Sequence, residues 1–515
     1  MQKIGIGACL GMLVVGCAAE QGPSGPNYDY RAGVPTQIDD AYYQRADEAV
    51  RSRLSENFKP QAKNVILFVG DGMGVSTVTA MRIYAGQSQG LDGESYKLSM
   101  EQMPYAAFSR TYSHDYQVPD SAATATAIVS GIKTRSGTLG VNAEVARGNC
   151  GTQAGNTVDS LFEMAERNGL ATGVISTARL THATPASTYS KAVSRDWEDD
   201  MSFDTGGTGD CPDIAKQLID WPVGDGFEIA MGGGRRHFLT DETFDPEYTD
   251  TRGRRGDERD LVSEWAAKSD QHEVIYDGAA FESTNFASDV RVLGLFEPSH
   301  MQYELDRPVD EAGEPSIAEM TEAAITRLSQ DEDGYVLMVE SGRIDHAHHG
   351  VNAVRALVDG VAFDDAIAKA VEMTDPAETL IIVTADHSHT MTMAGYPRRN
   401  NPILGKVTFE TGAIARAADG KPYTTIGYIN GPTACQADDE VLDCARQDVS
   451  TIDTTANDYR QQAAIFMPSE THSGEDVPIF ASGPGSELVR GVMDQNEIFH
   501  VMGYASGLVA MPTTE

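Results

Sequence analysis

Carboxylate and imidazole side chains that could bind a metal ion recur in three segments of the second half of the chain. Asp345 and His349 lie one helical turn apart, so a short helix would direct both at one ion. Asp386 and His387 follow an apolar run, and His472 lies in a polar segment further on. Zinc accepts imidazole nitrogen and carboxylate oxygen. Together these segments predict zinc binding; the first segment alone could equally be an exposed histidine-rich turn.

A second set of candidate ligands offers only oxygen atoms. Asp71, Thr184 and Glu340 are far apart in the sequence, and each carries a carboxylate or a hydroxyl group. Magnesium prefers such hard donors and completes its octahedron with water. These three residues therefore predict a magnesium site.

The elements that must position these donors are short apolar runs, which predict buried strands. Helix-like segments separate most of the runs, and this alternation predicts an α/β layered sheet. Asp71 follows the first run, Glu340 the fifth and Asp386 the sixth, at the strand ends where open α/β sheets place their sites. The runs are residues 64–69, 171–177, 227–231, 290–296, 335–339, 379–383 and 477–481.

Two regions lie outside this alternation. Residues 39–54 repeat apolar and charged side chains at helical spacing, which predicts an N-terminal helical arm within residues 38–60. Residues from about 390 to 458 have no strong periodicity and are rich in Gly, Asn, Asp and Thr. We expect them to form an inserted surface subdomain.

The first residues of the chain indicate export. Lys3 precedes an apolar run that is too short to span a bilayer, which predicts a signal peptide over residues 1–17. Residues 14–17 resemble a bacterial lipobox, so Cys17 would become the lipidated first residue; ordinary cleavage after Ala19 is the alternative. Glycines and prolines in residues 18–37 predict a tether. Either cleavage places the protein in the periplasm or anchors it to the outer membrane.

Four cysteines remain as possible disulfide partners after either cleavage, an even number in an oxidising compartment. They allow three pairings. Cys435 and Cys444 are so close in sequence that a local bridge between them is favoured, which leaves Cys150 to pair with Cys211. Four buried free thiols are the alternative.

The charge balance excludes one class of partner. The chain has 515 residues and a formal net charge of −38, from 77 acidic and 39 basic side chains. Such a surface repels nucleic acid, so we expect no nucleic-acid binding. It favours solubility in a saline medium, and it requires that any site for a phosphate group carry concentrated positive charge.

Six motifs in order resemble those of the alkaline phosphatase family. The resemblance runs from about Asn64 to Leu508, and six motifs in one order are far more specific than any one of them. It implies a three-layer α/β/α sandwich around a large, mostly parallel sheet with a crown-like insertion. The motifs are Gly70 to Gly74, Asp120 to Thr126, His182 to Pro185, Asp345 to His349, Thr384 to His389, and Thr471 to Glu475.

The resemblance assigns the metal ligands residue by residue. It implies two zinc ions and one magnesium ion. The first zinc would be bound by Asp345, His349 and His472. The second would be bound by Asp386 and His387, and Asp71 would bridge it to the magnesium, whose other ligands would be Thr184 and Glu340.

The resemblance also implies hydrolysis of phosphate monoesters through a phosphoserine. Ser121 would be the nucleophile, and Arg195, oriented by Asp120, would hold two phosphate oxygens with its planar fork. A serine hydroxyl is a poor nucleophile at neutral pH, and zinc can stabilise both its alkoxide and the leaving oxygen. These cations would supply the local positive charge that the surface lacks.

Histidines at positions 182 and 346 resemble the animal branch of the family, not the enterobacterial one. They would orient the magnesium site from outside its ligand set. The same branch implies a calcium ion bound by four residues, although a short insertion precedes the last of them; a solvated acidic surface is the alternative. The four are Glu247, Phe296 through its carbonyl, Glu297 and Glu314.

Three other functions are alternatives to monoester hydrolysis. The phosphodiesterases of the superfamily favour a threonine nucleophile and lack the magnesium residues, and its sulfatases need a modified cysteine. Ser121, Thr184 and Glu340 argue against both. A catalytically silent calcium- or phosphate-binding envelope protein would not need Ser121 and Arg195. By resemblance, the family also implies a homodimer.

Overall fold

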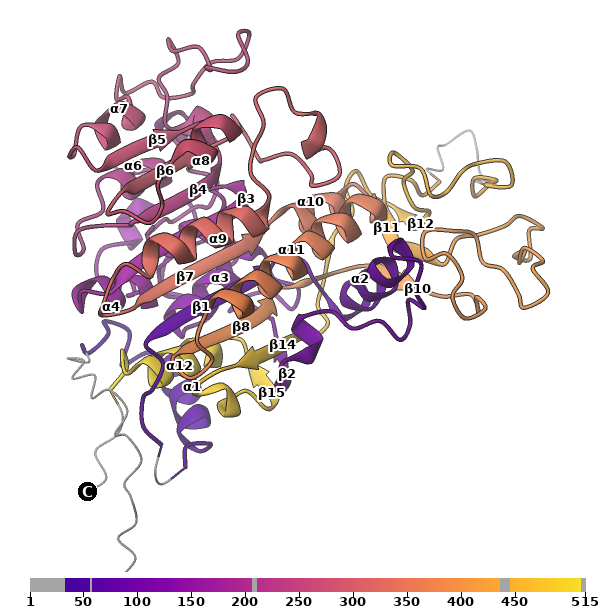
Figure 1. The fold of residues 1–515 in the computed structure, drawn as a ribbon, viewed down its shortest axis with the longest axis horizontal. Coiled ribbons are helices and arrows are strands. Elements are labelled where there is room, and N and C mark those ends of the chain that lie inside the picture. Colours follow the sequence, from indigo (N-terminus) through magenta and orange to yellow (C-terminus); the bar gives the residue numbers. More distant parts are fainter. Residues whose placement is uncertain (1–32, 56–57, 206–210, 436–444, 511–515) are drawn as a thin grey trace, which may run out of the picture.

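A ten-stranded, mostly parallel sheet forms the centre of the molecule (Figure 1). The computed structural model describes residues 33–55, 58–205, 211–435 and 445–510. The strand order is β15-β2-β14-β8-β1-β7-β3-β4-β6-β5, and β14 runs antiparallel to both of its neighbours. The strands are β1 (Asn64–Gly70), β2 (Tyr105–Arg110), β3 (Ala171–Arg179), β4 (Ile229–Gly233), β5 (His272–Ile275), β6 (Arg291–Leu295), β7 (Tyr335–Ser341), β8 (Thr379–Ala385), β14 (Val477–Ser482) and β15 (Gly491–Asp494).

Helices cover both faces of this sheet, which makes three layers. Strand β1 is continuously apolar from Val65 to Val69, as expected for a strand buried on both sides: Val65 and Leu67 pack into one core, and Ile66 and Phe68 pack into the other. Helices α1, α3, α4, α6, α7 and α12 contribute to the first core, and α2, α9 and α11 to the second. The predicted α/β/α sandwich is confirmed.

The helices begin where the sequence supplies capping side chains. Asp40 caps α1, and Ser160 and Ser316 form capping boxes at α4 and α9. Among the described residues, no helix combines the length and apolar composition needed to cross a membrane. The helices are α1 (Ala41–Arg51), α2 (Val75–Ser88), α3 (Ser121–Ser130), α4 (Leu161–Arg167), α5 (Ala183–Ala186), α6 (Ile214–Ile219), α7 (Leu261–Ala266), α8 (Gly278–Ser283), α9 (Ile317–Leu328), α10 (Arg343–His349), α11 (Ala353–Met373) and α12 (Glu497–Ser506).

The central strands bring candidate ligands to one edge of the sheet. Strand β1 lies between β7 and β8 and is parallel to both. Glu340 pairs in register with Val69, and Ala385 pairs with Gly70. The residues that follow, Asp71 and Asp386, therefore leave the sheet side by side.

All seven predicted strands are present, as β1, β3, β4, β6, β7, β8 and β14. Strands β2, β5 and β15 were not predicted; they lie at or next to the ends of the sheet. Strand β2 alternates between buried and exposed residues at its centre, so it lacks the continuous apolar run of a central strand.

A small three-stranded sheet projects from the main body, beyond α10 and α2 in Figure 1. It consists of β10 (Met391–Met393), β11 (Ile426–Gly431) and β12 (Ala463–Phe466). Long irregular segments connect these strands, in the region predicted as an inserted subdomain. A separate two-stranded pair joins β9 (Ser388–His389) to β13 (His472–Ser473).

The N-terminal arm is helical as predicted, because α1 lies within residues 38–60. The predicted tether ends earlier than Gln37. The buried Gln37 amide donates hydrogen bonds to the carbonyl oxygens of Ser130 (2.7 Å) and Asp159 (2.9 Å), so Gln37 is part of the folded body. The predicted signal peptide, with Cys17, lies outside the described residues.

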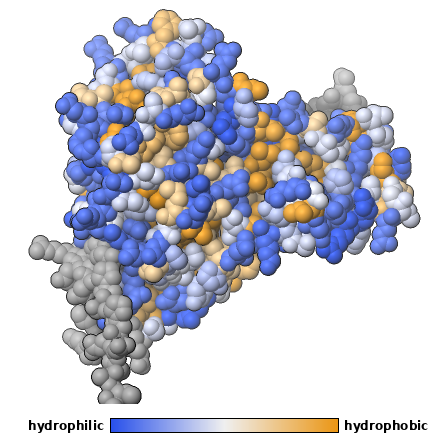
Figure 2. All heavy atoms as spheres, viewed as in Figure 1, coloured by the Kyte–Doolittle hydropathy of each residue, from blue (hydrophilic) through white to orange (hydrophobic). Residues whose placement is uncertain are grey.

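A disulfide joins Cys150 to Cys211, as predicted. The second predicted bridge joins Cys435 to Cys444, and Cys444 lies outside the described residues. Hydrophilic residues cover most of the face drawn in Figure 2, in keeping with the formal net charge of −38.

Candidate active site

The predicted nucleophile opens a helix. Ser121 is the first residue of α3, and Asp120 is its N-cap. The side chain of Ser121 is buried, and its Oγ lies 3.2 Å from Nε2 of His387. The positive end of the α3 dipole therefore faces the point where a serine oxygen would become charged.

Asp120 and Arg195 form an ion pair beside this serine. Arg195 Nη1 donates to Asp120 Oδ2 at 3.1 Å, and the carboxylate also accepts the N–H of Gly137 at 3.0 Å. Burial opposes ionisation, but Arg195 and the Gly137 N–H hold the pKa of Asp120 below its ordinary value. The carboxylate is thus ionised and fixes the arginine fork in place.

Asp71, Asp386 and His387 form one of the predicted ligand groups. Their donor atoms lie within 4.8 Å of one another, and all three side chains are buried. Nε2 of His387 is 3.4 Å from Asp71 Oδ1 and 3.3 Å from Asp386 Oδ2. Asp386 is anchored by the N–H of Gly72, which donates to its Oδ1 at 3.0 Å.

In the described part of the chain, the buried carboxylate of Asp71 lacks the hydrogen-bond partners that an ionised group requires. Both of its carboxylate oxygens are buried and have no hydrogen-bond partner among the described residues. Burial and the neighbouring carboxylates of Asp386, Asp345 and Glu340 raise the pKa of Asp71 well above its ordinary value. A divalent cation would satisfy these oxygens and permit the ionised form, so the donor set fits a metal.

The predicted magnesium residues lie on the other side of Asp71. Donor atoms of Asp71, Glu340 and His182 lie within 4.8 Å of one another. Burial raises the pKa of Glu340 to about 8, although the hydroxyl groups of Ser176 and Thr184 approach the carboxyl and lower it. Thr184 is thus placed beside Glu340, as expected.

His182 has a contact that was not foreseen. Arg195 Nη2 donates to His182 Nε2 at 2.9 Å, so this histidine touches the arginine directly. His346, the other predicted orienting residue, lies 5.5 Å away between ring centroids, and burial lowers its pKa to about 3. His300, which was not predicted, packs 3.9 Å from His346 and contacts Arg179.

The third group contains the predicted ligands of the first zinc. Asp345 Oδ1 lies 3.3 Å from Nε2 of His349 and 3.4 Å from Nε2 of His472. The two histidine Nε2 atoms are 3.2 Å apart. Nδ1 of His472 donates to the carbonyl of Pro119 at 2.8 Å, which leaves Nε2 as the ligating nitrogen.

His389 is a fourth member of this group that the sequence analysis did not assign. Its Nε2 lies 2.7 Å from Asp345 Oδ1. Two-residue alternation in an extended segment puts His387 and His389 on the same side, and this signal was available in the sequence. Gly72 makes room for the ring, because a Cβ there would stand 2.3 Å from His389 Cδ2.

The predicted calcium residues lie apart, in loops near β6. Carboxylate oxygens of Glu247, Glu297 and Asp310 lie within 4.8 Å of one another, and we call these three residues the outer acidic cluster. Phe296 directly precedes Glu297. The predicted ligand Glu314 is not part of this group.

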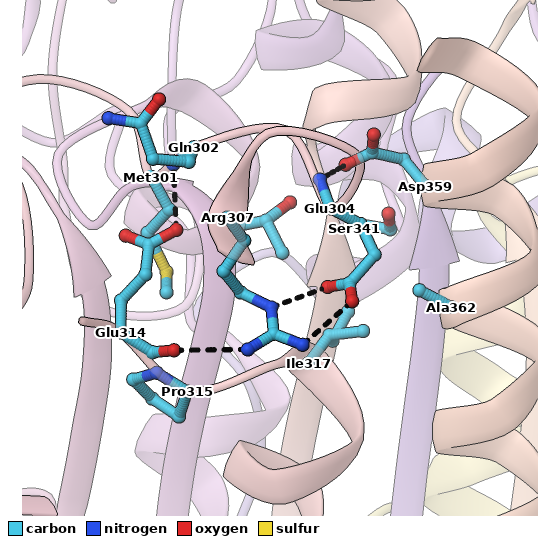
Figure 3. Close-up of a pocket in the computed structure, with 11 residues that line it drawn as sticks. Met301, Gln302, Glu304, Arg307, Glu314, Pro315, Ile317, Ser341, Asp359 and Ala362 are labelled. Atoms are coloured by element: carbon cyan, nitrogen blue, oxygen red, sulfur yellow. Dashed lines mark hydrogen bonds and ion pairs between the residues drawn. The ribbon is translucent and has the colours of Figure 1, made fainter. Parts of the chain in front are cut away.

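Glu314 lines a small pocket of its own, shown in Figure 3. Its Oε1 accepts the N–H of Gln302 at 2.8 Å, and its carbonyl accepts from Arg307. Burial and the nearby Glu297 raise the pKa of Glu314 to about 9. Asp310, and not Glu314, therefore supplies the third carboxylate of the outer acidic cluster.

Comparisons with known proteins agree with this geometry. A family model described as alkaline phosphatase matches residues 62–508. The tissue-nonspecific alkaline phosphatase of Gallus gallus is 42% identical over 484 residues, which cover 92% of this chain and 91% of that protein. An alkaline phosphatase of Gadus morhua is 42% identical over 455 residues, covering 87% and 92%.

Solved structures give the same result. The alkaline phosphatase of Thermus thermophilus superposes with a TM-score of 0.63 at 25% identity, covering 89% of this chain and 94% of that one. The enzyme of the Antarctic bacterium TAB5 gives 0.59 at 25% identity, covering 87% and 99%. With its motifs assembled at one sheet edge, the chain belongs to the alkaline phosphatase family and hydrolyses phosphate monoesters.

Proposed function

We propose that Ser121 attacks the phosphorus of a monoester and forms a phosphoserine. The observation that carries this proposal is the position of Ser121 Oγ, at the start of α3 and 3.2 Å from His387 Nε2. The hydroxyl thus adjoins a predicted zinc ligand and the N-terminal end of a helix, so a bound zinc and the helix dipole would both favour the charged oxygen.

The three donor groups support two zinc ions and one magnesium ion. When bound, these ions would supply Lewis-acid stabilisation to the attacking and leaving oxygens. A solved histidine-to-aspartate variant of the TAB5 enzyme holds magnesium, which agrees with the third ion. The groups are Asp345, His349 and His472 for the first zinc, Asp71, Asp386 and His387 for the second, and Asp71 and Glu340 for magnesium, with Thr184 beside Glu340.

Arg195 would bind the phosphoryl group of the substrate. Its guanidinium is held from two sides, by Asp120 on Nη1 and by His182 on Nη2. A fork fixed in this way presents its remaining N–H groups to two phosphate oxygens without losing side-chain freedom on binding. His182 therefore has a role toward Arg195 as well as toward the magnesium site.

Metal analysis combined with two substrates tests this function. The purified protein should contain two zinc ions and one magnesium ion per chain, and it should hydrolyse an aryl phosphate monoester much faster than the matching diester. A faster diester reaction would favour a phosphodiesterase, and no hydrolysis of either would favour a silent binding protein.

We further propose a calcium ion at the outer acidic cluster. Burial, reinforced by the Glu247 carboxylate, raises the pKa of Glu297 to about 7, which a bound cation would reverse. Hard oxygen donors on irregular loops suit calcium, which tolerates variable geometry. Asp310 supplies the third carboxylate, and the Phe296 carbonyl remains a candidate.

A homodimer is the oligomer that the apolar surface supports. Strand β15 forms an unpaired edge of the sheet, where a groove is lined by α2, β2 and β14. Phe108 and Val492 in this groove are 46% and 54% exposed. Such patches mark interfaces. Light scattering on the protein and on Phe108→Asp should give a dimer and a monomer, respectively.

Export and lipid attachment rest on the first 17 residues. The lipobox-like segment before Cys17 supports an outer-membrane lipoprotein, and cleavage after Ala19 would instead give a soluble periplasmic protein. Mass spectrometry of the mature N-terminus separates the two: we expect acylated Cys17 as the first residue.

A further inference from the structure

Glu470 is a buried acid that belongs to none of the predicted ligand sets. It is 1% exposed and lies two residues before His472. An ionisable side chain is rarely buried to this extent unless it is fully paired. Glu470 contacts His349 directly and Asp345 through the ring of His389, and both are ligands proposed for the first zinc.

The backbone of Glu470 holds His349. Nδ1 of His349 donates to the Glu470 carbonyl at 2.6 Å, and the Glu470 N–H donates to the His349 carbonyl at 3.1 Å. With the proton on Nδ1, the other ring nitrogen keeps its lone pair for the metal. The two hydrogen bonds thus fix the tautomer of His349 and the position of the end of α10.

The carboxylate of Glu470 reaches Asp345 through His389. Oε2 lies 2.6 Å from His389 Nδ1, and Nε2 of the same ring lies 2.7 Å from Asp345 Oδ1. Oε1 accepts both the N–H (2.7 Å) and the hydroxyl (2.6 Å) of Thr390. Both oxygens are occupied, so the carboxylate cannot turn without breaking a contact. The ring of His389 is therefore fixed between two carboxylates.

We infer that Glu470 is a positioning residue for the first zinc site, which orients His349 through its carbonyl and Asp345 through its carboxylate and His389. The inference rests on the zinc assignment proposed above and goes beyond it, because Glu470 belongs to none of the proposed ligand sets. Removal of groups that orient metal ligands typically weakens metal binding by about 10–100-fold.

Zinc binding by Glu470→Ala tests the role of the carboxylate, because this variant keeps the backbone hydrogen bonds between residue 470 and His349. Zinc is removed from the holoenzyme with a chromophoric chelator, and the zinc remaining per chain is measured. We expect the first zinc to be held about 10–100-fold more weakly, with the second zinc retained. Glu470→Gln, which can hydrogen-bond to Thr390 and to the His389 ring together, should recover most of the loss.

Glu228→Ala is the matched control. Glu228 is also a buried glutamate, 5% exposed, but it pairs with Thr172 and Arg291 in another part of the sheet. Its removal makes a comparable packing defect and should leave zinc binding within about twofold of the wild type. If Glu470→Ala does not fold, Thr390→Val removes one donor to the carboxylate and should weaken zinc binding about 2–10-fold.

A double-mutant cycle with His389→Ala tests the route. If the carboxylate acts through the ring, Glu470→Ala should cost little once His389 is absent. If the fold losses of zinc affinity in the two single variants multiply in the double variant, the two residues act independently. That result would overturn the proposal that the Glu470 carboxylate acts on Asp345 through His389.

The outcomes separate this inference from the zinc assignment. A wild-type protein that binds no zinc overturns the assignment and the inference with it. A wild type that binds two zinc ions, with Glu470→Ala holding them no more weakly than Glu228→Ala, overturns the inference alone.

Discussion

The carboxylates at the strand ends, which we call the catalytic cluster, and the outer acidic cluster contain similar side chains but lie in different parts of the fold. Asp71, Glu340 and Asp386 stand at the ends of three adjacent strands, and each is fully buried. Glu247 and Asp310 lie on loops and remain partly exposed. Parallel pairing fixes the first set in register, whereas the second depends on the path of the loops. The comparison predicts that substitutions in the catalytic cluster affect chemistry and those in the outer cluster affect stability.

Ser121→Ala should have the largest effect. Loss of the nucleophile should lower kcat for an aryl phosphate by at least about 10³-fold while the zinc and magnesium content stays unchanged. Ser130→Ala, at the other end of α3 and equally buried, is the control and should remain active. Near-normal turnover by Ser121→Ala would remove the serine from the mechanism.

Arg195→Ala should have the next largest effect, with kcat/KM about 10²-fold lower, because two phosphate oxygens lose their donor fork. Arg195→Lys should recover only part of this, since an ammonium group cannot contact Asp120, His182 and phosphate in the same plane. Steady-state kinetics provide the measurement. Equal activity of the lysine variant and the wild type would contradict the proposal that the Arg195 guanidinium binds two phosphate oxygens.

Changing His182 to Asp and His346 to Lys should alter the magnesium site and, through His182, the support of Arg195. We expect magnesium affinity to change by about tenfold and the pH profile of kcat to shift, because His182 lies among the magnesium donors and His346 packs against His182. Zinc should stay bound. Metal content measured after dialysis decides this, and loss of zinc from the double variant would show that the rings support the zinc sites instead.

Glu297→Gln should have the smallest effect on chemistry. In the wild type, calcium should raise Tm, because an ion at 100 times its Kd stabilises the native state by about 2.7 kcal/mol. The variant should lose this rise and keep its activity within about twofold. Equal rises in Tm for both proteins would contradict the calcium site.

The pH dependence of calcium binding sharpens the same comparison. Calcium needs the ionised carboxylate, and the pKa of Glu297 is raised to about 7. Calcium affinity should therefore fall as the pH is lowered from about 8 to about 6, where an ordinary glutamate would still be ionised. Calorimetric titration at the two pH values measures this, and equal affinities would exclude Glu297 as a ligand.

The parts that could be predicted from the sequence are those with strong local signals. The buried strands around β1 are continuous apolar runs, and the predicted ligands lie at their ends. The apolar runs thus predicted the strands, and the motifs that follow them predicted the site. Strands β2 and β15 were missed because partly exposed strands near a sheet edge lack such runs. Edge strands are specified by their neighbours more than by their own composition.

The rest of the site depends on contacts between distant segments. Glu470 and His389 are 81 residues apart, and nothing local indicates that one would hold the other. Glu314 was expected in the outer acidic cluster, and Asp310 lies there instead. The sequence predicts which types of side chain bind a metal. Which of several nearby acids does so depends on distances that only tertiary packing sets.

The most direct test of the central claim is to trap the phosphorylated residue. Wild-type protein is mixed with substrate, quenched in acid, digested and examined by mass spectrometry. The account predicts one phosphate, on the peptide that contains Ser121, and none in Ser121→Ala. A phosphate on any other residue, or rapid turnover with no phosphopeptide under conditions that stabilise phosphoserine, would contradict it.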